Sequence, residues 1–329
     1  MKRVRPLLGL AVLCGTLASL SAKDLKVLMI GNSFSICVQR NLPKIVHAAA
    51  PGHSLRLASA YIGGCSMEKH LEHIEALEAD PQAEGHKDAY LVTIFDSKKP
   101  ARPMVKRRGN VNELLVAEKW DIVTIQEASP RSWQENGYRQ FGDKLVAYIH
   151  EKAPQARIIL QQTWAYRADD PRICPLRSYE WHFGQAEFYA RIDHAVRAFA
   201  QRHGLPVIPA GYAVQLVRQH EERKFQPLSK EALADFRWPD LPPQASDPVG
   251  KYYWEKDKEG VLSLKGDYIH LNIRGEYLQA CVWFQFLYGV PATEIAYEHP
   301  DISRADCQFL RRMARQAVET YLAEEKKDK

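Results

Sequence analysis

Short apolar runs alternate with amphipathic stretches along most of the chain. These runs, together with one segment of alternating polar and apolar positions, predict five strands, at residues 26–30, 54–62, 121–125, 157–160 and 206–209. Apolar residues at helical spacing predict helices between and after them, at 38–50, from the N-cap residue Ser66 to about 77, and at 141–152, 187–203, 273–288 and 304–323. Strands that alternate with helices of about 10–15 residues favour a mostly parallel sheet with helices on both faces.

Two regions break this alternation. Residues 90–109 contain six basic side chains within 98–108, and we expect this segment to loop out. Residues 226–266 are rich in proline and then predict a hairpin, with strands at 252–256 and 261–264. We interpret both regions as insertions over one face of a single domain that spans residues 23–329.

The N-terminus has the order of a secretory signal peptide. Lys2, Arg3 and Arg5 precede an apolar run at 6–20, which is followed by small residues at Ser21 and Ala22. The run is shorter than the roughly 20 residues that a membrane span needs. We therefore expect residues 1–22 to be a signal peptide and the mature chain to be periplasmic or secreted, without stable membrane insertion.

Composition excludes several classes of protein. The chain has 329 residues, of which 46% are hydrophobic and 26% charged, so it is neither disordered, collagen-like nor of low complexity. Its 45 basic and 40 acidic residues give a net charge of +5, and an exported protein meets little nucleic acid, so we expect no nucleic-acid partner. The six cysteines form no CxxC pair and no dense framework, so no zinc site is indicated, although one or two disulfides remain open.

Candidate chemistry lies just after the predicted strands, because open parallel sheets bind ligands at the carboxyl ends of their strands. Ser33 follows the first strand, where a tight turn would expose its hydroxyl at a helix N-terminus. The alternative is that Ser33 and Ser35 only cap that helix. Gly63 and Gly64 follow the second strand, and adjacent glycines suit either an oxyanion hole or an ordinary turn.

Two further segments add donors and a base. Gln126 follows the third strand, where its carboxamide either donates to an oxyanion or belongs to a surface loop. Asp267 and His270 stand three positions apart before the helix at 273–288. A serine nucleophile needs a base, and the imidazole needs an acceptor that fixes its tautomer. The alternative is that Asp267 and Asn272 serve only as turn and cap residues.

Taken together, these segments resemble blocks of the SGNH hydrolases, a branch of the GDSL-type esterases and lipases. Residues 31–35 (GNSFS) are similar to the first block, with Asn32 where many members have aspartate. Gly63 and Gly64 are similar to the glycine block, and residues 267–270 to the DxxH block. The amino-acid sequences of these blocks are most similar to those of an exported bacterial branch without an assigned activity. The resemblance covers residues 25–287.

The resemblance implies a fold and a catalytic triad. The fold would be a three-layer α/β/α sandwich around a mostly parallel, five-stranded, flavodoxin-like sheet. Ser33 would be the nucleophile, His270 the general base and later acid, and Asp267 its orienting partner. No metal and no organic cofactor would be required.

It also implies an oxyanion hole, formed by the N–H groups of Ser33 and of Gly64 or Gly63. A departure from the family lies at Gln126, near the position where the family supplies asparagine in a GxND loop. Loss of one oxyanion donor can cost about 100-fold or more in rate, so the longer side chain leaves the donor role of Gln126 open.

Substrate contacts are expected from Asn32 beside the nucleophile and from Trp164 and Tyr166 after the fourth strand, whose rings could stack on sugar faces or pack in the core. By analogy with the family, the expected reaction is removal of O-acetyl groups from a carbohydrate, with a small-molecule or polysaccharide ester as substrate. One alternative is a carbohydrate-binding protein with little or no turnover. Another is a lipase or thioesterase, which would need a long apolar groove.

Two other features carry less weight. His70 and His73 stand beside Glu68 and Glu72 on one predicted helix, but HLEH is not HExxH, so a solvated helix face is favoured over a metal site. The basic segment 98–108 predicts a solvated loop, with an anionic glycan as the alternative partner.

Overall fold

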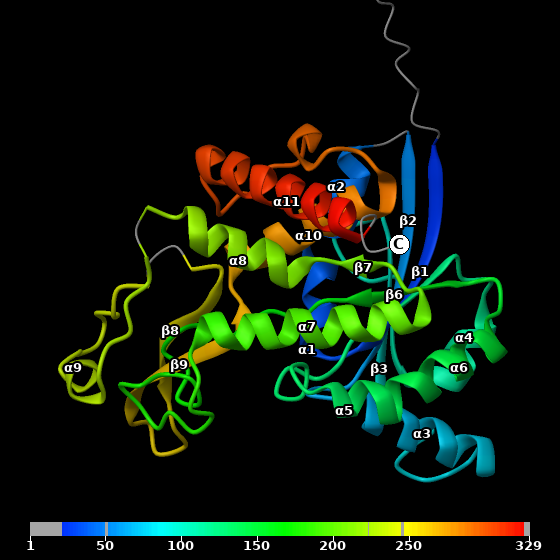
Figure 1. Ribbon diagram of the computed structural model, residues 1–329, viewed down its shortest axis with the longest axis horizontal. Coiled ribbons are helices and arrows are strands. Elements are labelled where there is room, and N and C mark those ends of the chain that lie inside the picture. Colours follow the sequence, from blue (N-terminus) through cyan, green and yellow to red (C-terminus); the bar gives the residue numbers. More distant parts are fainter. Residues whose placement is uncertain (1–21, 50–51, 223, 245–246, 326–329) are drawn as a thin grey trace, which may run out of the picture.

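The computed structural model describes residues 22–49, 52–222, 224–244 and 247–325 (Figure 1). The predicted signal peptide, apart from Ala22, lies outside these residues. Five parallel strands form the centre of the main sheet, in the order β2-β1-β5-β6-β7. Their bounds are β1 (Lys23–Gly31), β2 (His53–Tyr61), β5 (Ile122–Ile125), β6 (Arg157–Gln161) and β7 (Val207–Ile208). This is the flavodoxin-like order 2-1-3-4-5, so the predicted fold class is confirmed.

The segment 90–109 does not loop out. It forms β3 (Tyr90–Asp96) and β4 (Val105–Gly109), which extend the sheet to seven strands as an antiparallel edge beside β2. The basic residues that hid this hairpin lie in its connection and along β4, where three consecutive side chains are exposed. Charges on an outer strand protect its unpaired edge from other chains, so the basic run is compatible with a strand.

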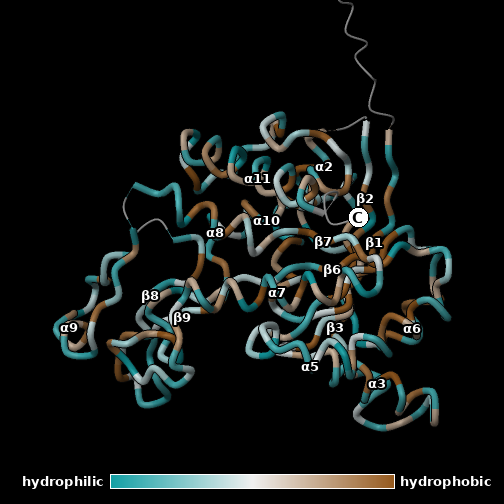
Figure 2. The backbone as a smooth tube through the Cα atoms, viewed as in Figure 1, coloured by the Kyte–Doolittle hydropathy of each residue, from teal (hydrophilic) through white to brown (hydrophobic). Residues whose placement is uncertain are grey.

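Helices cover both faces of the sheet (Figure 1). One layer contains α2 (Leu42–Ala48), α8 (Ala210–His220), α10 (Ile273–Tyr288) and α11 (Arg304–Glu325). The other contains α3 (Met67–Ala79), α4 (Val111–Ala117), α6 (Asp143–Lys152) and α7 (Gln185–His203). Hydrophobic residues concentrate along the central strands in Figure 2, as expected for a sheet that is buried on both faces.

Helix α10 has the predicted bounds, and nearly all of its side chains are buried. The helix predicted at 38–50 is instead divided into η1 (Cys37–Arg40) and α2, and α1 (Ser33–Ile36) precedes it. The remaining short elements are α5 (Glu135–Gly137), η2 (Tyr138–Gly142), α9 (Lys230–Ala234) and η3 (Ala292–Glu294). None of the helices in the described ranges is long and apolar enough to cross a membrane.

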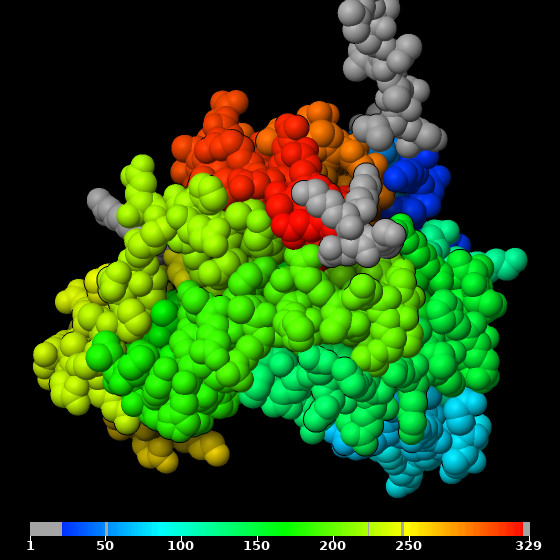
Figure 3. All heavy atoms as spheres, in the orientation of Figure 1, coloured from blue at the N-terminus to red at the C-terminus, as the bar shows by residue number. Residues whose placement is uncertain are grey.

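The predicted hairpin is present and forms a separate two-stranded sheet. It consists of β8 (Val249–Lys256) and β9 (Leu262–Leu271), and β9 leads directly into α10. With α9 it forms a flank of the molecule, drawn in yellow in Figures 1 and 3. The five cysteines in the described part of the chain are buried free thiols rather than disulfides.

Candidate active site

Ser33 lies at the turn between β1 and α1, at the centre of the sheet. Asn32 caps α1, because its Oδ1 atom accepts the N–H of Phe34 at 3.0 Å. A Cβ atom at Gly31 would lie 2.5 Å from the Oγ of Ser35, so a larger residue there would displace that side chain. Because Asn32 is the cap, the hydroxyl of Ser33 is left free for another partner.

That partner is the imidazole of His270, which comes from β9. The Nε2 atom of His270 lies 2.9 Å from the Oγ of Ser33, and its Nδ1 atom lies 2.9 Å from the Oδ2 of Asp267. The imidazole is 41% exposed and the carboxylate 25%, so the pair borders solvent while remaining partly shielded. The structure therefore brings together the three residues predicted as the triad, in the order that proton transfer from a serine requires.

Asp267 is held in its ionised form. Burial would raise the pKa of its carboxyl, but hydrogen bonds from the His270 ring and from the N–H groups of His270 and Ile269 outweigh it. The net result is a pKa well below the ordinary value for aspartate. Asp267 thus shapes the turn and also orients the imidazole, while Asn272 caps α10.

The strand that carries Asp267 and His270 is docked to the segment that follows β6. The indole Nε1 of Trp164 donates to the carbonyl of Ile269 at 2.8 Å, and the N–H of Arg167 donates to the carbonyl of Tyr268 at 2.8 Å. The ring of Trp164 also stacks on Phe34, with centroids 4.1 Å apart. Trp164 therefore links the helix of the nucleophile to the strand of the base.

The predicted sugar-stacking role of these aromatic residues is wrong. Trp164 and Tyr166 are both 0% exposed, so neither ring can reach a ligand. The hydroxyl of Tyr166 donates to the Oγ of Ser129 at 2.9 Å, which satisfies its polar end inside the core. Both residues follow a strand end, but their side chains point into the protein.

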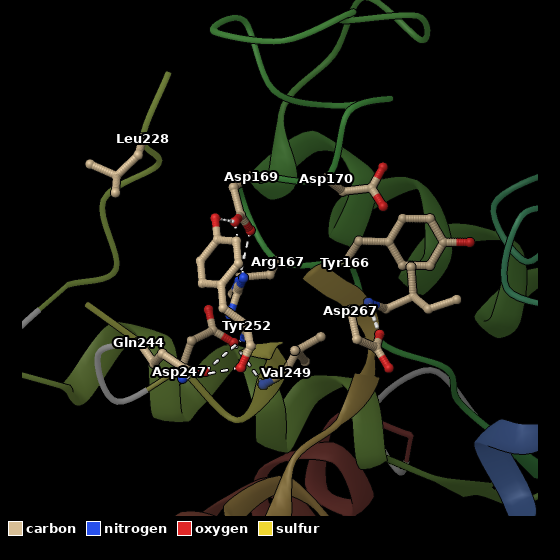
Figure 4. A network of polar contacts seen from close by, with 12 residues as sticks. Tyr166, Arg167, Asp169, Asp170, Leu228, Gln244, Asp247, Val249, Tyr252 and Asp267 are labelled. Carbon is tan, nitrogen blue, oxygen red and sulfur yellow. Dashed lines mark hydrogen bonds and ion pairs between the residues drawn. The ribbon is translucent and has the colours of Figure 1, made fainter. Parts of the chain in front are cut away.

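A buried ion pair fixes the other strand of the hairpin (Figure 4). Arg167 and Asp169 are fully buried and joined by two hydrogen bonds of 2.7 and 2.9 Å. The hydroxyl of Tyr252 on β8 also donates to Asp169, and the guanidinium of Arg167 lies 4.7 Å from the centroid of the Tyr252 ring and 4.5 Å from that of Phe225. This network was not predicted from the sequence, although the charged residues 167–170 (RADD), in the segment that follows the fourth strand, were a signal for it.

The N–H groups of Ser33, Gly63 and Gly64 are the candidate donors to an oxyanion. Gly64 is exposed and has a φ of +63°, a conformation that favours glycine. Within the described ranges, no group accepts a hydrogen bond from the N–H of Ser33, Gly63 or Gly64. The glycine turn is tied to the nucleophile turn by Asn32, whose Nδ2 donates to the carbonyl of Cys65 at 2.9 Å. The N–H groups of Ser33, Gly63 and Gly64 are therefore all free to donate to a ligand.

Gln126 does not have the predicted place in the oxyanion hole. It is 1% exposed, its Nε2 donates to the Oδ1 of Asn32 at 2.7 Å, and its Oε1 accepts from Gln161. Asn32 itself is 2% exposed and uses both ends of its amide inside the protein, so its predicted contact with substrate is also wrong. The side-chain amides of Asn32 and Gln126 therefore stabilise the turn that carries Ser33, from inside the protein.

A cavity of about 790 Å³ opens beside the triad. Its lining includes Ser33, Asp267 and His270. On one side it is bordered by apolar and polar residues of the sheet, and on the other by the hairpin and α10. The remaining lining residues that bear on function are Ile36, Arg40, Leu91, Thr93, Phe95, Lys106, Lys251, Arg274 and Glu276.

The histidines of α3 are not on a solvated face as the sequence analysis favoured. His70 is 0% exposed and bonds to the hydroxyl of Tyr90 at 2.9 Å, and His73 is 8% exposed and lies 3.0 Å from a ring nitrogen of His86. Burial lowers the pKa of His70 to about 3, so this side chain is neutral. No group of three His, Cys, Asp or Glu side chains in the described ranges is placed to hold a metal ion.

Comparison with known proteins places the chain in a family. Residues 26–224, more than half of the chain, match the family described as a domain of unknown function, DUF4886. The chain belongs to the DUF4886 family. This match includes Ser33, Gly64 and Gln126, whereas Asp267 and His270 lie beyond it. No curated protein matches the chain.

A solved structure of a DUF4886 protein from Bacteroides uniformis is similar over nearly the whole chain. It is 25% identical, covers 90% of this chain and 95% of that one, and has a TM-score of 0.68. A protein from Slackia heliotrinireducens, provisionally described as an SGNH hydrolase, is 14% identical over 80% of this chain and 100% of that one, with a TM-score of 0.43. A lipase/acylhydrolase from Enterococcus faecalis is 13% identical over 80% and 96%, with a TM-score of 0.42. The predicted resemblance to SGNH hydrolases agrees with the descriptions of these neighbours.

Proposed function

We propose that this DUF4886 protein is a serine esterase that hydrolyses a carboxylic ester through an acyl-enzyme. The observation that carries the proposal is the continuous chain from the Ser33 hydroxyl through His270 to Asp267, with both contacts at 2.9 Å. A serine hydroxyl on an imidazole that is itself oriented by a carboxylate is the arrangement that activates a serine nucleophile.

In the proposed reaction, Ser33 attacks the ester carbonyl while its proton moves to the Nε2 of His270. The tetrahedral oxyanion accepts hydrogen bonds from the N–H groups of Ser33 and Gly64, next to the N-terminus of α1. His270 then donates the proton to the leaving alcohol, and the acyl group remains on Ser33. A water molecule, deprotonated by His270, attacks the acyl-enzyme, and collapse of the second intermediate releases the acid and restores the hydroxyl.

Removal of O-acetyl groups from a carbohydrate is the substrate class that we favour within this activity. The family resemblance supports it, while the buried rings of Trp164 and Tyr166 no longer do. The charged residues that line the cavity speak against the alternative of a lipase or thioesterase, because a long acyl chain needs an apolar groove. The alternative of an inactive binding protein rested on the longer side chain of Gln126 at an expected oxyanion donor. Gln126 instead donates a hydrogen bond to Asn32 inside the protein.

The test compares Ser33→Ala with the wild-type protein on nitrophenyl acetate and on a long-chain nitrophenyl ester. We expect the wild type to prefer the acetate and Ser33→Ala to lose at least about 1,000-fold in kcat. A fluorophosphonate should add its mass to Ser33 in the wild type and not in the variant. Ser263→Ala, on the same hairpin but away from the triad, serves as the control. Hydrolysis that is unchanged in Ser33→Ala would overturn the proposal.

A further inference from the structure

The cavity beside Ser33 contains more positive than negative side chains. Four cationic residues line it, namely Arg40, Lys106, Lys251 and Arg274, against two acidic ones, Asp267 and Glu276. A cleft lined by charges of one sign concentrates ligands of the opposite sign, because the low-dielectric walls focus the field. The question is which of these charges are free to act on a ligand.

Several of them are neutralised within the protein. Arg274 is paired with Glu221 and Asp306, and Asp267 is bonded to His270. Arg40 is paired with Glu276. Burial raises the pKa of the Glu276 carboxyl, while the charge of its partner Arg40 opposes that effect.

Lys106 and Lys251 are the two cations that remain. In the part of the chain that the structure describes, neither lysine has a carboxylate within ion-pair distance. The Nζ atom of Lys251 lies 5.6 Å from the centroid of the Tyr253 ring. Both side chains are exposed, so both ammonium groups are open to solvent and to a ligand.

The backbone directs these two lysines to the cavity from different elements. Lys106 on β4 is paired in register with Thr93 on β3, so the two side chains lie on the same face of the sheet. Leu91 and Phe95 lie on this face as well, because side chains alternate along a strand, and all of these residues line the cavity.

Lys251 on β8 is paired in register with Asp267 on β9. Cross-strand partners share a face, so Lys251 stands beside the carboxylate that orients His270. Lys251, Glu276 and His270 all line the same cavity.

We propose that the ester hydrolysed at Ser33 carries an anionic group, which Lys106 and Lys251 bind. This inference rests on the proposed esterase function and adds the charge class of its substrate. A lysine ammonium is a point charge without a fixed fork, so a carboxylate or a sulfate would serve equally well. The apolar side chains between the two lysines contact the uncharged part of the ligand.

The kinetic test uses acetyl esters of glucose, glucuronic acid and glucose 6-sulfate, with nitrophenyl butyrate and nitrophenyl hydrogen succinate as a second pair that carries the charge in the acyl group. We expect a lower KM for the anionic members of at least one set. Lys106→Gln and Lys251→Gln should each raise that KM about three- to fivefold, and the double variant at least tenfold, with a much smaller effect on the KM of the neutral esters. The advantage of the anionic esters should shrink as salt is added.

Matched controls are available on the same elements. Lys99→Gln changes an exposed lysine in the β3–β4 connection, and Lys256→Gln changes one at the far end of β8, and neither residue lines the cavity. Both controls should leave every KM unchanged. An equal rise in KM for the controls and the cavity variants would show a general charge effect and would overturn the inference.

A binding measurement separates this inference from the proposed function. Calorimetric titration of Ser33→Ala with the same acetylated sugars measures binding affinity without hydrolysis, because the variant lacks the proposed nucleophile. Tighter binding of the anionic sugars, lost in Ser33→Ala combined with the two lysine changes, supports the inference even if no ester is cleaved. Equal binding and equal KM for neutral and anionic esters would overturn it, whereas Ser33-dependent cleavage would then leave the esterase proposal intact.

Discussion

The Nε2 atom of His270 lies 2.9 Å from the Oγ of Ser33, although 237 positions separate the two residues in the chain. Ser33 is held by the central strand of the parallel sheet, whereas His270 comes from a hairpin that is not part of that sheet. The alignment of nucleophile and base therefore depends on how firmly this hairpin is docked to the segment that follows β6.

The first prediction concerns that docking. Arg167→Met leaves the carboxylate of Asp169 fully buried without its cation, and we expect a loss of about 3–5 kcal/mol in the free energy of unfolding. Urea denaturation measures it, and kcat for a short acyl ester should fall as β8 loosens. Arg315→Met, which breaks an exposed helical pair with Glu319, should cost only about 0.3–0.5 kcal/mol. Equal losses in the two variants would contradict the assigned role of Arg167.

Local patterns were sufficient to predict the parallel strands and the triad. The strands that precede Ser33 and Gln126 contain apolar runs and the one before Gly64 alternates polar and apolar positions, and the carboxyl ends of all three meet at one edge of the sheet. The pairing of Asp267 with His270 is local as well, because the two side chains meet across only three positions of the chain.

The direction of side chains after a strand could not be predicted in the same way. Trp164, Tyr166 and Gln126 all follow strand ends, yet their packing partners Phe34, Ser129 and Asn32 come from other elements. Contacts with residues far away in the chain decide which side of a loop faces the core. Such contacts cannot be predicted from local patterns in a single sequence. The edge strand β4 was not predicted for the same reason. Its own residues are mostly charged, and its strand conformation depends on pairing with β3.

The second prediction separates support from catalysis at Gln126. Gln126→Met keeps the volume but removes the hydrogen bonds to Asn32 and Gln161, so buried polar groups lose their partners. We expect a cost of about 1–3 kcal/mol in the free energy of unfolding. Because Gln126 does not line the cavity, kcat of the folded variant should fall by less than about tenfold. A loss of about 100-fold or more with unchanged stability would instead identify it as an oxyanion donor.

The third prediction concerns Asp267. Asp267→Asn keeps the shape of the side chain but no longer favours the imidazole tautomer that can accept a proton from Ser33. We expect kcat to fall by about four orders of magnitude, with a smaller change in KM. Stopped assays at neutral pH on a short acyl ester measure this effect, and a loss of less than about tenfold would contradict the orienting role.

The lowered pKa of Asp267 also predicts a pH dependence of stability. The folded carboxyl titrates below the ordinary value of 3.8, so the unfolded chain takes up the proton first as the pH falls. The stabilisation from this group is therefore complete above about pH 5, and it is lost as the pH falls through 3.8 towards the folded pKa. The difference in unfolding free energy between the wild type and Asp267→Asn should be constant from pH 7 to 5 and then shrink. A difference that grows below pH 4 would contradict the assignment.

The last prediction tests how closely β8 must approach the triad. Gly250 lies at an irregularity in the β8–β9 register with a φ of +79°, and a Cβ atom there would lie 2.5 Å from the backbone oxygen of Asp267. Gly260 at the hairpin tip has a φ of +83° but no neighbour within 4 Å of a Cβ atom. Alanine at either position carries the same left-handed strain, about 1–2 kcal/mol. Gly250→Ala alone must also displace Asp267, so kcat/KM for a short acyl ester should fall at least about tenfold in Gly250→Ala and stay near the wild-type value in Gly260→Ala. If both variants lose stability but keep full activity, the contact between Gly250 and Asp267 does not position the acid.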